Sequence, residues 1–458
     1  MVEIISKSMV KAQPPPQLPA DQKYHLTPWD LAMLSAHYIQ KGHLFANLPS
    51  TLSIETIINN LKTSLSAALH HFYPLAGRLA TQHELDNDGM YVFIDCNNEG
   101  AEFIHADAHL VSVEDVLAPS SDDITALLVP SFFPLDGAVN HDGHTSPLFA
   151  VQLTVLSDGV FLGFASNHVV GDGTSFWNFL NAWAEIARSK LPSRSPPILD
   201  RYLMDFGAKP PLKLPFSHES QFIVRFHPPP FSEKVFHFSS EAMAKLKAKA
   251  NEERGTSNII SSFQSLSALM WRCITRARRI PVEQVTNCRV AIENRTRLRP
   301  ALSPNYFGNS VYALCITATT GELLSNELGW AAWLIHEAVV AYTDDVIREM
   351  VRKWVEAPMV YNASMFDEFS VLMGSSPRFD MYGCDFGWGR AVALRSGSAN
   401  KFYGKVSSYP GWEGCGSVDL EVCLETESMA ALEADPEFRA AVSQPVPLRD
   451  LLSKNING

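Results

Sequence analysis

The sequence predicts an α/β protein of two similar-sized domains, each with a mixed β-sheet flanked by helices. Strand and helix patterns alternate in both halves of the chain, and a proline-rich segment separates the halves. At roughly 150 residues per domain the 458 residues would permit about three domains, but two large ones fit equally well. We expect an N-terminal domain at 1–190, a crossover linker at 191–230 and a C-terminal domain at 231–458.

The crossover is placed by its prolines. Nine of the 29 prolines lie between residues 190 and 230. Proline removes a backbone donor and fixes φ, so neither a helix nor a central strand runs far through such a segment.

The N-terminal half ends in a strand-turn-helix pattern. Residues 147–155 and 160–167 are two β-rich runs joined by Ser157, Asp158 and Gly159, which predicts a hairpin. From 174 to 188 the apolar residues recur at helical spacing. His168 to Gly173 should therefore form a tight turn between a buried strand and a helix.

The C-terminal half combines both kinds of element. Helices are predicted at 239–253 and 261–279, the second more buried than the first, and strands at 290–292, 310–316, 391–394 and 417–424. This mixture indicates a second layered α/β domain.

Composition excludes several classes of function. With 37 Lys and Arg against 49 Asp and Glu, the net charge of −12 gives no general attraction to nucleic acid or anionic lipid. A small anionic ligand must then be bound by a local basic pocket. No apolar run approaches the roughly 20 residues of a membrane span, and no secretory signal is recognisable, so we expect a soluble cytoplasmic protein.

Cysteine usage fits a reducing compartment. The seven cysteines are odd in number, scattered and never spaced as C-x-x-C. They predict reduced thiols, mostly in the core, and no structural zinc or other metal site.

His168 and Asp172 are four residues apart in the predicted turn. A neutral imidazole accepts a proton near pH 7, because its reference pKa is about 6.5. On this spacing alone, a structural histidine at the end of a sheet is the favoured interpretation. The second motif, Asp385 to Gly389, places two glycines around Trp388, a composition typical of a backbone-constrained turn.

These two motifs occur together with four other characteristic segments. Six segments stand in order along nearly the whole chain: Leu26 to Asp30, His71 to Leu79, Asn167 to Gly173, Arg295 to Pro300, Asn305 to Asn309, and Asp385 to Gly389. In sequence and order they strongly resemble the BAHD acyltransferases of plants.

The resemblance implies a fold like that of chloramphenicol acetyltransferase, with a solvent channel between the domains. It implies His168 as the general base at the centre of that channel, removing a proton from an alcohol or amine that attacks an acyl-CoA thioester. Acyl-CoA would be a co-substrate, with no bound cofactor, and the protein would be a monomer.

The resemblance also implies supporting residues. Asp172, with Gly173 after it, would turn away from the substrate and pair with an arginine, which holds the loop of His168. Asp385, with Gly387, Trp388 and Gly389, would lie away from the channel. Asp385 would meet an arginine of the segment that carries Arg295 and Arg297.

Ser261 and Ser262 resemble the segment of the family that contacts coenzyme A. They open a predicted helix, where backbone donors suit phosphate and amide groups. Helix capping alone would equally explain two serines at this position.

Departures from the family bear on the substrates. Hydroxycinnamoyl-transferring relatives often carry a Ser-Trp pair before the Asp385 motif, whereas residues 374–384 have none, so we expect a differently shaped acceptor pocket. Ser310 stands where the malonylating anthocyanin branch has cysteine, which disfavours a malonyl donor.

Two other classes of function stay open. The same scaffold could act without coenzyme A, as a lyase or rearrangement catalyst. A hydrolase with a serine nucleophile is disfavoured, because the sequence has no Gly-x-Ser-x-Gly elbow. Release of free thiol from a thioester in the presence of an acceptor separates acyl transfer from chemistry without coenzyme A.

Overall fold

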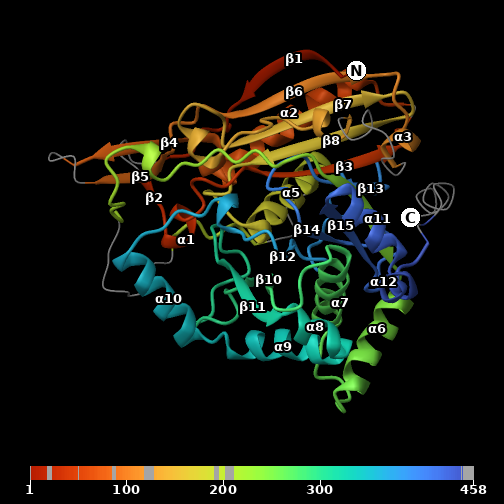
Figure 1. Cartoon of the computed structure of the whole chain (residues 1–458). Helices are drawn as coiled ribbons and strands as arrows, with labels where there is room; N and C mark the ends of the chain where they lie inside the picture. The colour runs from red at the N-terminus through yellow and green to blue at the C-terminus, as the bar shows by residue number, and fades with distance from the viewer. Residues whose placement is uncertain are drawn as a thin grey trace.

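The computed structural model describes residues 2–17, 23–49, 51–84, 89–117, 128–189, 195–201, 211–444 and 446. Within this part of the chain, two six-stranded sheets and one three-stranded sheet combine with helices. The α/β class with mixed sheets is thereby confirmed. Figure 1 shows the first large sheet above the second, with α7 beside the second sheet and α6, α8 and α9 toward the bottom of the view.

The first large sheet has the strand order β1-β6-β7-β8-β3-β13. Its strands are β1 (Glu3–Val10), β3 (Ile39–Ala46), β6 (Ala101–Ala108), β7 (Phe149–Leu156), β8 (Gly159–Ser166) and β13 (Ala393–Arg395). β6 and β7 run parallel, and the other neighbouring strands are antiparallel. The short helix α3 (Val113–Leu117) lies beyond β6 along the chain.

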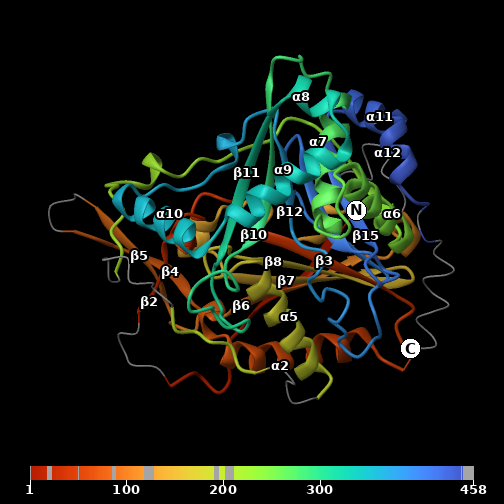
Figure 2. The same ribbon diagram turned by 90° about the horizontal axis from the view of Figure 1, so that it is seen from below.

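The predicted hairpin is confirmed as β7 and β8, which pair up to Val155 and Val160. Every residue of β8 is buried. The predicted helix is α5 (Gly173–Ala187), and it packs beside α2 (Ile54–His71), as Figure 2 shows from below. The side-chain amide of Asn60 in α2 donates to the carbonyl of Ala187 at 3.1 Å.

A small antiparallel sheet adjoins the N-terminal half, with the order β2-β5-β4. Its strands are β2 (Lys23–His25), β4 (Arg78–His83) and β5 (Met90–Asp95). The short helix α1 (Pro28–Leu31) follows β2, so the chain enters the site region from this sheet.

The second large sheet has the order β11-β10-β12-β14-β15-β9. Its strands are β9 (Ser232–Phe238), β10 (Val285–Glu293), β11 (Val311–Thr319), β12 (Val371–Gly374), β14 (Lys405–Pro410) and β15 (Val418–Leu424). β12 runs parallel to both of its neighbours, β10 and β14, so this sheet is mixed as well.

The helices of the C-terminal half are α6 (Ser240–Glu253), α7 (Ser262–Ala277), α8 (Thr320–Ser325), α9 (Leu328–Ala341), α10 (Asp344–Glu356), α11 (Thr426–Ala434) and α12 (Pro436–Ala441). The predictions for α6 and α7 are confirmed within two residues at each end. Ser239 and Ser261 cap the starts of these two helices, each with its hydroxyl accepting a backbone N–H.

One segment departs from the predicted assignment of 231–458 to a single C-terminal domain. β13 joins the edge of the first sheet, where Ala393 pairs with Leu44 of β3. Just before it, Phe386 and Trp388 belong to the N-terminal core. These large aromatic side chains are buried there, and a turn motif read from local sequence carries no signal for which core receives it.

The described part of the crossover touches both halves. Ile198 forms an isolated parallel bridge with Tyr306, and Leu214 forms an antiparallel one with Met90. Between residues 211 and 230 the backbone forms no helix or strand beyond the Leu214 bridge and a short 3₁₀ turn, Glu219–Gln221, in agreement with its prolines. Residues 191–194 and 202–210 of the predicted linker lie outside the described residues.

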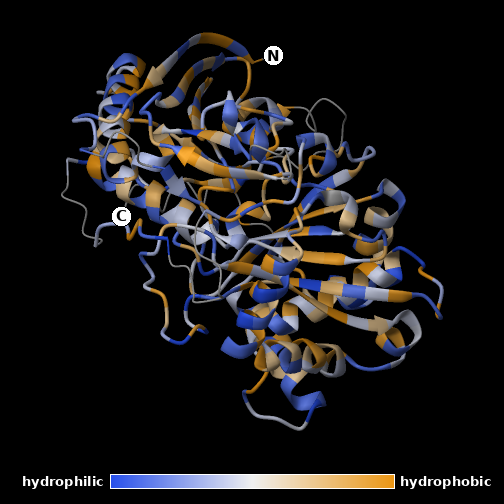
Figure 3. Cartoon of the chain, turned by 90° about the vertical axis from the view of Figure 1, so that its left-hand side faces the viewer, coloured by the Kyte–Doolittle hydropathy of each residue, from blue (hydrophilic) through white to orange (hydrophobic). Residues whose placement is uncertain are grey.

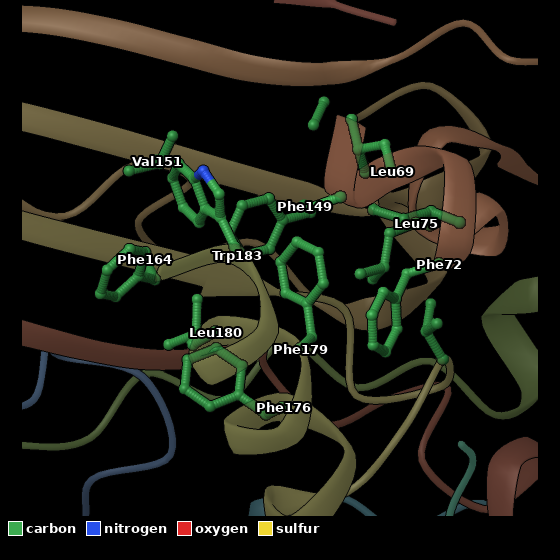
Figure 4. Packing of buried hydrophobic residues seen from close by; sticks show 14 of the residues in the cluster. Leu69, Phe72, Leu75, Phe149, Val151, Phe164, Phe176, Phe179, Leu180 and Trp183 are labelled. Carbon is green, nitrogen blue, oxygen red and sulfur yellow. The ribbon is translucent and has the colours of Figure 1, made fainter. Parts of the chain in front are cut away.

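The N-terminal core is rich in aromatic side chains. Figure 4 shows Trp183 of α5 between Phe164 of β8 and Phe149 of β7, and Phe179 of α5 between Phe149 and Phe72. Across the chain, Figure 3 shows hydrophobic segments along strands and helices of both halves. Trp183 is fully buried, and its indole N–H donates to the hydroxyl of Ser64 at 2.9 Å.

We predict that Trp183→Ala lowers the free energy of unfolding by about 3 to 5 kcal/mol, the usual cost of deleting a buried aromatic side chain. Chemical denaturation followed by circular dichroism measures it. Val340→Ala is the control, because Val340 is 61% exposed and its truncation should leave the midpoint unchanged. Equal midpoints for both variants would contradict this account of the core.

Candidate active site

The backbone at His168 is fixed by two buried asparagines. His168 follows β8, and its N–H donates to Oδ1 of Asn140 at 2.7 Å. Asn167 donates through Nδ2 to the carbonyl of Asn140 at 2.7 Å and accepts from the N–H of Val169 at 3.0 Å. The loop therefore leaves the buried strand in one defined direction.

The imidazole of His168 meets Asn309 from the other half of the chain. Nδ1 of His168 lies 3.1 Å from Oδ1 of Asn309. Nδ2 of Asn309 donates to the carbonyl of His168 at 2.7 Å and to Oδ1 of Asp30 at 2.8 Å.

This arrangement defines the tautomer of His168. A carbonyl and an ionised carboxylate only accept hydrogen bonds, so the NH₂ group of Asn309 must face them. Oδ1 of Asn309 then faces Nδ1 of His168, which must carry the proton. Nε2 is left as the unprotonated atom with its lone pair available.

Asp30 anchors this network. Its side chain is fully buried, and it accepts from the N–H and the hydroxyl of Thr27 at 2.8 and 2.7 Å. The N–H of Asn309 donates to it at 3.0 Å, and a guanidinium nitrogen of Arg201 lies 3.4 Å away. Four donors and one cation thus compensate a buried charge.

Burial lowers the pKa of His168, because a charged imidazolium is disfavoured away from water. The carboxylates of Asp172 and Asp30 and the bond to Asn309 oppose this effect without cancelling it. The side chain nevertheless keeps some exposed surface. His168 is therefore a neutral imidazole that solvent or a substrate can reach.

The predicted pairing of Asp172 with an arginine is confirmed, and the partner is Arg295. Two guanidinium nitrogens of Arg295 lie 2.7 and 3.0 Å from the two carboxylate oxygens. The carboxylate also accepts from the N–H of Ser175, which caps α5, and from the N–H of Ser310. Both oxygens are occupied by these partners rather than by His168.

The charge of Asp172 is stable at its buried position. Burial alone would raise the pKa of this carboxyl group. The Arg295 guanidinium and the hydrogen bonds from Ser175 and Ser310 overcome that effect, and the pKa lies below its ordinary value. Asp172 and Arg295 thus form a buried ion pair between the two halves.

Gly173, predicted to support the site, packs closely against Phe379. A Cβ atom at this position would lie 2.9 Å from the ring of Phe379. Gly308 is similarly confined, since a Cβ there would collide with the guanidinium of Arg201.

The prediction that Asp385 meets Arg295 or Arg297 is wrong. Asp385 pairs with Arg188, just after α5, at 3.7 Å, and Arg188 also donates to the Asp385 carbonyl. Arg295 is already held by Asp172, and Arg297 donates to the carbonyls of Val339 and Tyr342.

The Asp385 motif forms a turn closed by its own aspartate. Oδ1 of Asp385 accepts from the N–H groups of Gly387, Trp388 and Gly389 at 2.7, 3.1 and 3.0 Å. Gly387 and Gly389 have φ angles of +99° and +88°, which favour glycine. The turn sets Trp388 against Phe45 in the N-terminal core, so its contribution is to packing.

Ser261 lies at the start of α7 as predicted, and its polar groups are used there. Its hydroxyl accepts from the N–H of Gln264 at 3.3 Å, and its own N–H donates to Oε1 of Gln264 at 2.8 Å. Capping accounts for Ser261. Contact of Ser261 or Ser262 with coenzyme A stays a prediction.

Sequence reasoning missed the residues that orient His168. Asn309 and Asp30 stand inside segments quoted for the family resemblance, yet no role was assigned to them, and Asn140 and Arg201 carried no motif. The available signal was polar residues in otherwise apolar surroundings at 26–30 and 305–309. Their meeting depends on contacts between residues up to 279 positions apart.

A cavity of about 420 Å³ lies between residues 198–201 and 300–306. Arg201 and Tyr306 belong to its wall. It does not include His168, but Arg201 links it to the Asp30 carboxylate and thereby to Asn309.

The described residues offer neither a candidate metal site nor a candidate membrane-spanning helix. No group of three histidine, cysteine or acidic side chains there is arranged to hold a metal ion. None of the helices in the described ranges has the length and apolar character needed to cross a membrane.

Comparison with known sequences identifies a protein family and relatives that match nearly the whole chain. The family described as "Transferase family" matches residues 1–439. An uncharacterized acetyltransferase of Arabidopsis thaliana is 37% identical over 447 residues, covering 95% of this chain and 98% of the relative.

Comparison with solved structures supports the fold. Vinorine synthase is 20% identical with a TM-score of 0.76, and the match covers 97% of this chain and 99% of that one. TRI101 of F. graminearum, complexed with coenzyme A and T-2 mycotoxin, is 18% identical with a TM-score of 0.70, covering 92% and 99%. At these identities the likeness concerns the two-domain fold alone.

We predict that Asp172→Asn lowers the free energy of unfolding by about 3 kcal/mol or more, because Arg295 loses its buried counter-ion and keeps only Glu293, at 3.5 Å, whose side chain is 41% exposed. Denaturant unfolding measures it. The matched control is Asp385→Asn, whose carboxylate is 35% exposed and whose replacement amide oxygen can still accept the three turn N–H groups. An Asp172→Asn midpoint equal to that of wild type would contradict the assignment.

Proposed function

The chain belongs to the Transferase family, the BAHD acyltransferases, and from this premise we propose that it transfers an acyl group from an acyl-CoA thioester to a small alcohol or amine. His168 is the general base of the proposed reaction. The observation that carries the proposal is the free Nε2 of a neutral imidazole, opposite a hydrogen-bonded Nδ1.

The proposed chemistry follows from that atom. Nε2 of His168 takes the proton from the acceptor hydroxyl or amine as the acceptor attacks the thioester carbonyl. The tetrahedral intermediate collapses, the carbon–sulfur bond breaks, and the thiolate receives the proton from the imidazolium. The enzyme itself is not acylated, and the imidazole returns to its starting state.

Asn309 is a positioning residue in this scheme. When Nε2 accepts a proton, the resulting imidazolium keeps its Nδ1 bond to the amide oxygen of Asn309, and Asp30 holds the amide in place. Asp172 takes no part in proton transfer, since its two oxygens are bound to Arg295, Ser175 and Ser310. It supports the loop that carries His168.

The nature of the donor rests on the relatives. TRI101, which shares the fold, has been crystallised with coenzyme A, which supports a coenzyme A thioester for this chain. Ser261 and Ser262 are our proposed contacts for it. As the family resemblance implies, we propose a monomer that acts in the cytoplasm with no bound cofactor.

We predict that His168→Ala lowers turnover by roughly 100- to 10,000-fold, the usual contribution of a general base, with the fold retained. The assay measures free thiol from acetyl, malonyl, benzoyl and hydroxycinnamoyl thioesters incubated with a panel of alcohols and amines. His109→Ala is the control, because that side chain is 70% exposed. Absence of thiol release from wild type with every pair would overturn acyl transfer, and unchanged turnover in His168→Ala would overturn the assigned base.

The pH dependence of kcat/KM gives a second test. The base works when neutral, so activity falls as the pH drops through the pKa of His168. Because burial lowers that pKa below its ordinary 6.5, we predict that the acidic limb of the profile lies below pH 6.5. An acidic limb centred at or above 6.5 would mean that another group or an unburied imidazole controls the reaction.

A further inference from the structure

The second large sheet turns a polar face toward the first sheet. In β14 and β15, Val406 and Leu420 point into the C-terminal core. Side chains alternate along a strand, so Lys405, Tyr409 and Glu421 point the other way. Tyr409 accordingly belongs to the N-terminal core, and Figure 1 shows β14 and β15 beneath β3.

Lys41 of β3 reaches across to this face. Its ammonium group donates to the hydroxyl of Tyr409 at 2.8 Å and lies 4.6 Å from the centre of the Tyr409 ring. At this point the two sheets therefore meet through a lysine and a tyrosine.

A third lysine, Lys401, forms ion pairs with the two carboxylates of this region. The ammonium group of Lys401 lies 2.6 Å from Glu233 and 3.3 Å from Glu421. Ser396 also donates its hydroxyl to Glu421. Lys401 is thus paired, and the carboxylates nearest to Lys41 and Lys405 are already engaged.

The position of the Lys405 ammonium group depends on the absence of a side chain at Gly374. A Cβ atom on Gly374, at the end of β12, would lie 2.3 Å from the ammonium nitrogen of Lys405, so the amine occupies the space that a side chain at 374 would fill. Among the described ion pairs, none joins Lys405 or Lys41 to a carboxylate. Both lysines keep partly exposed surface.

The charges at this place are not balanced. Burial lowers the pKa of Lys41 and that of Lys405 to about 8, opposed in each case by Glu421. The proximity of Lys405 lowers the pKa of Lys41 further. Burial raises the pKa of Glu233, and the adjacent Lys401 opposes this effect. Three lysines therefore face two carboxylates, Glu233 and Glu421, between the sheets.

We propose that Lys41 and Lys405 bind a carboxylate carried by a substrate of the acyl transfer, either at the far end of the acyl group or on the acceptor. The inference rests on the proposed function and narrows it to a dicarboxylic monothioester donor or a hydroxy or amino acid acceptor. A bound carboxylate supplies the missing negative charge and accepts from both ammonium groups.

The position of Lys41 relative to His168 fits this role. Lys41 pairs with Phe164 of β8, four residues before His168. Even fully extended, four residues of chain span at most roughly 14 Å, part of which the lysine side chain itself covers. The carboxylate subsite and the base therefore lie within reach of one small substrate.

Isothermal titration with matched probes tests the proposal. Succinyl-CoA and butyryl-CoA differ by a terminal carboxylate and test the donor. 3-Hydroxybenzoate and its methyl ester test the acceptor. Wild type should bind the carboxylate member of one pair about tenfold more tightly, and Lys41→Met and Lys405→Met should each abolish that preference. Lys245→Met, with a side chain 74% exposed, should retain it.

Gly374→Ala is the second variant, since it keeps both lysines and displaces the amine of Lys405, and it should weaken the same preference. The pair that shows the preference identifies the donor or the acceptor as the source of the carboxylate. No preference in either pair, or a preference that survives both lysine variants, would overturn the subsite. Unchanged butyryl-CoA binding in the variants shows that fold and donor site are intact, and thiol release from neutral thioesters tests the proposed function separately.

Discussion

Two buried carboxylates of the N-terminal half accept backbone hydrogen bonds from the segment 308–310 of the C-terminal half, and the geometry of the site depends on these bonds. Asp30 accepts the N–H of Asn309, and Asp172 accepts the N–H of Ser310. Each carboxylate has its own arginine, Arg201 or Arg295. Removing a partner from a buried, hydrogen-bonded charge is strongly destabilising. These contacts therefore fix the junction between the two halves next to the imidazole of His168.

These hydrogen bonds explain how Asp30 and Asp172 position His168 although neither binds its imidazole directly. Asp172 fixes the start of α5 and hence the turn after His168, whereas Asp30 fixes the amide of Asn309 and hence the imidazole itself. In a Ser-His-Asp arrangement a carboxylate binds the imidazole directly, but here a neutral amide does so. A neutral partner stabilises an imidazolium less than a charged one, and this agrees with the lowered pKa of His168.

Local patterns predicted what depends on local sequence. The hairpin before His168 and the helices that begin after Ser239 and Ser261 are present. The pairing of Asp172 with an arginine is present as well, but it was implied by the family resemblance and not by a local pattern, since Arg295 lies 123 positions away. The partner of Asp385 was wrong, because Arg188 and Asp385 lie 197 positions apart and several arginines fit equally well by sequence. Asn309 and the lysines between the sheets were missed for the same reason: their environment comes from contacts across the two halves, which periodicity does not encode.

The central claim is that Asn309 keeps the proton of His168 on Nδ1, so that Nε2 is the base. Two-bond ¹H–¹⁵N correlation NMR of the protein labelled with ¹⁵N-histidine measures this directly, with His168→Gln to assign the resonance. We predict that at neutral pH His168 is the Nδ1–H tautomer in wild type, and that it loses this preference in Asn309→Ala. A wild-type His168 protonated on Nε2 would contradict the account.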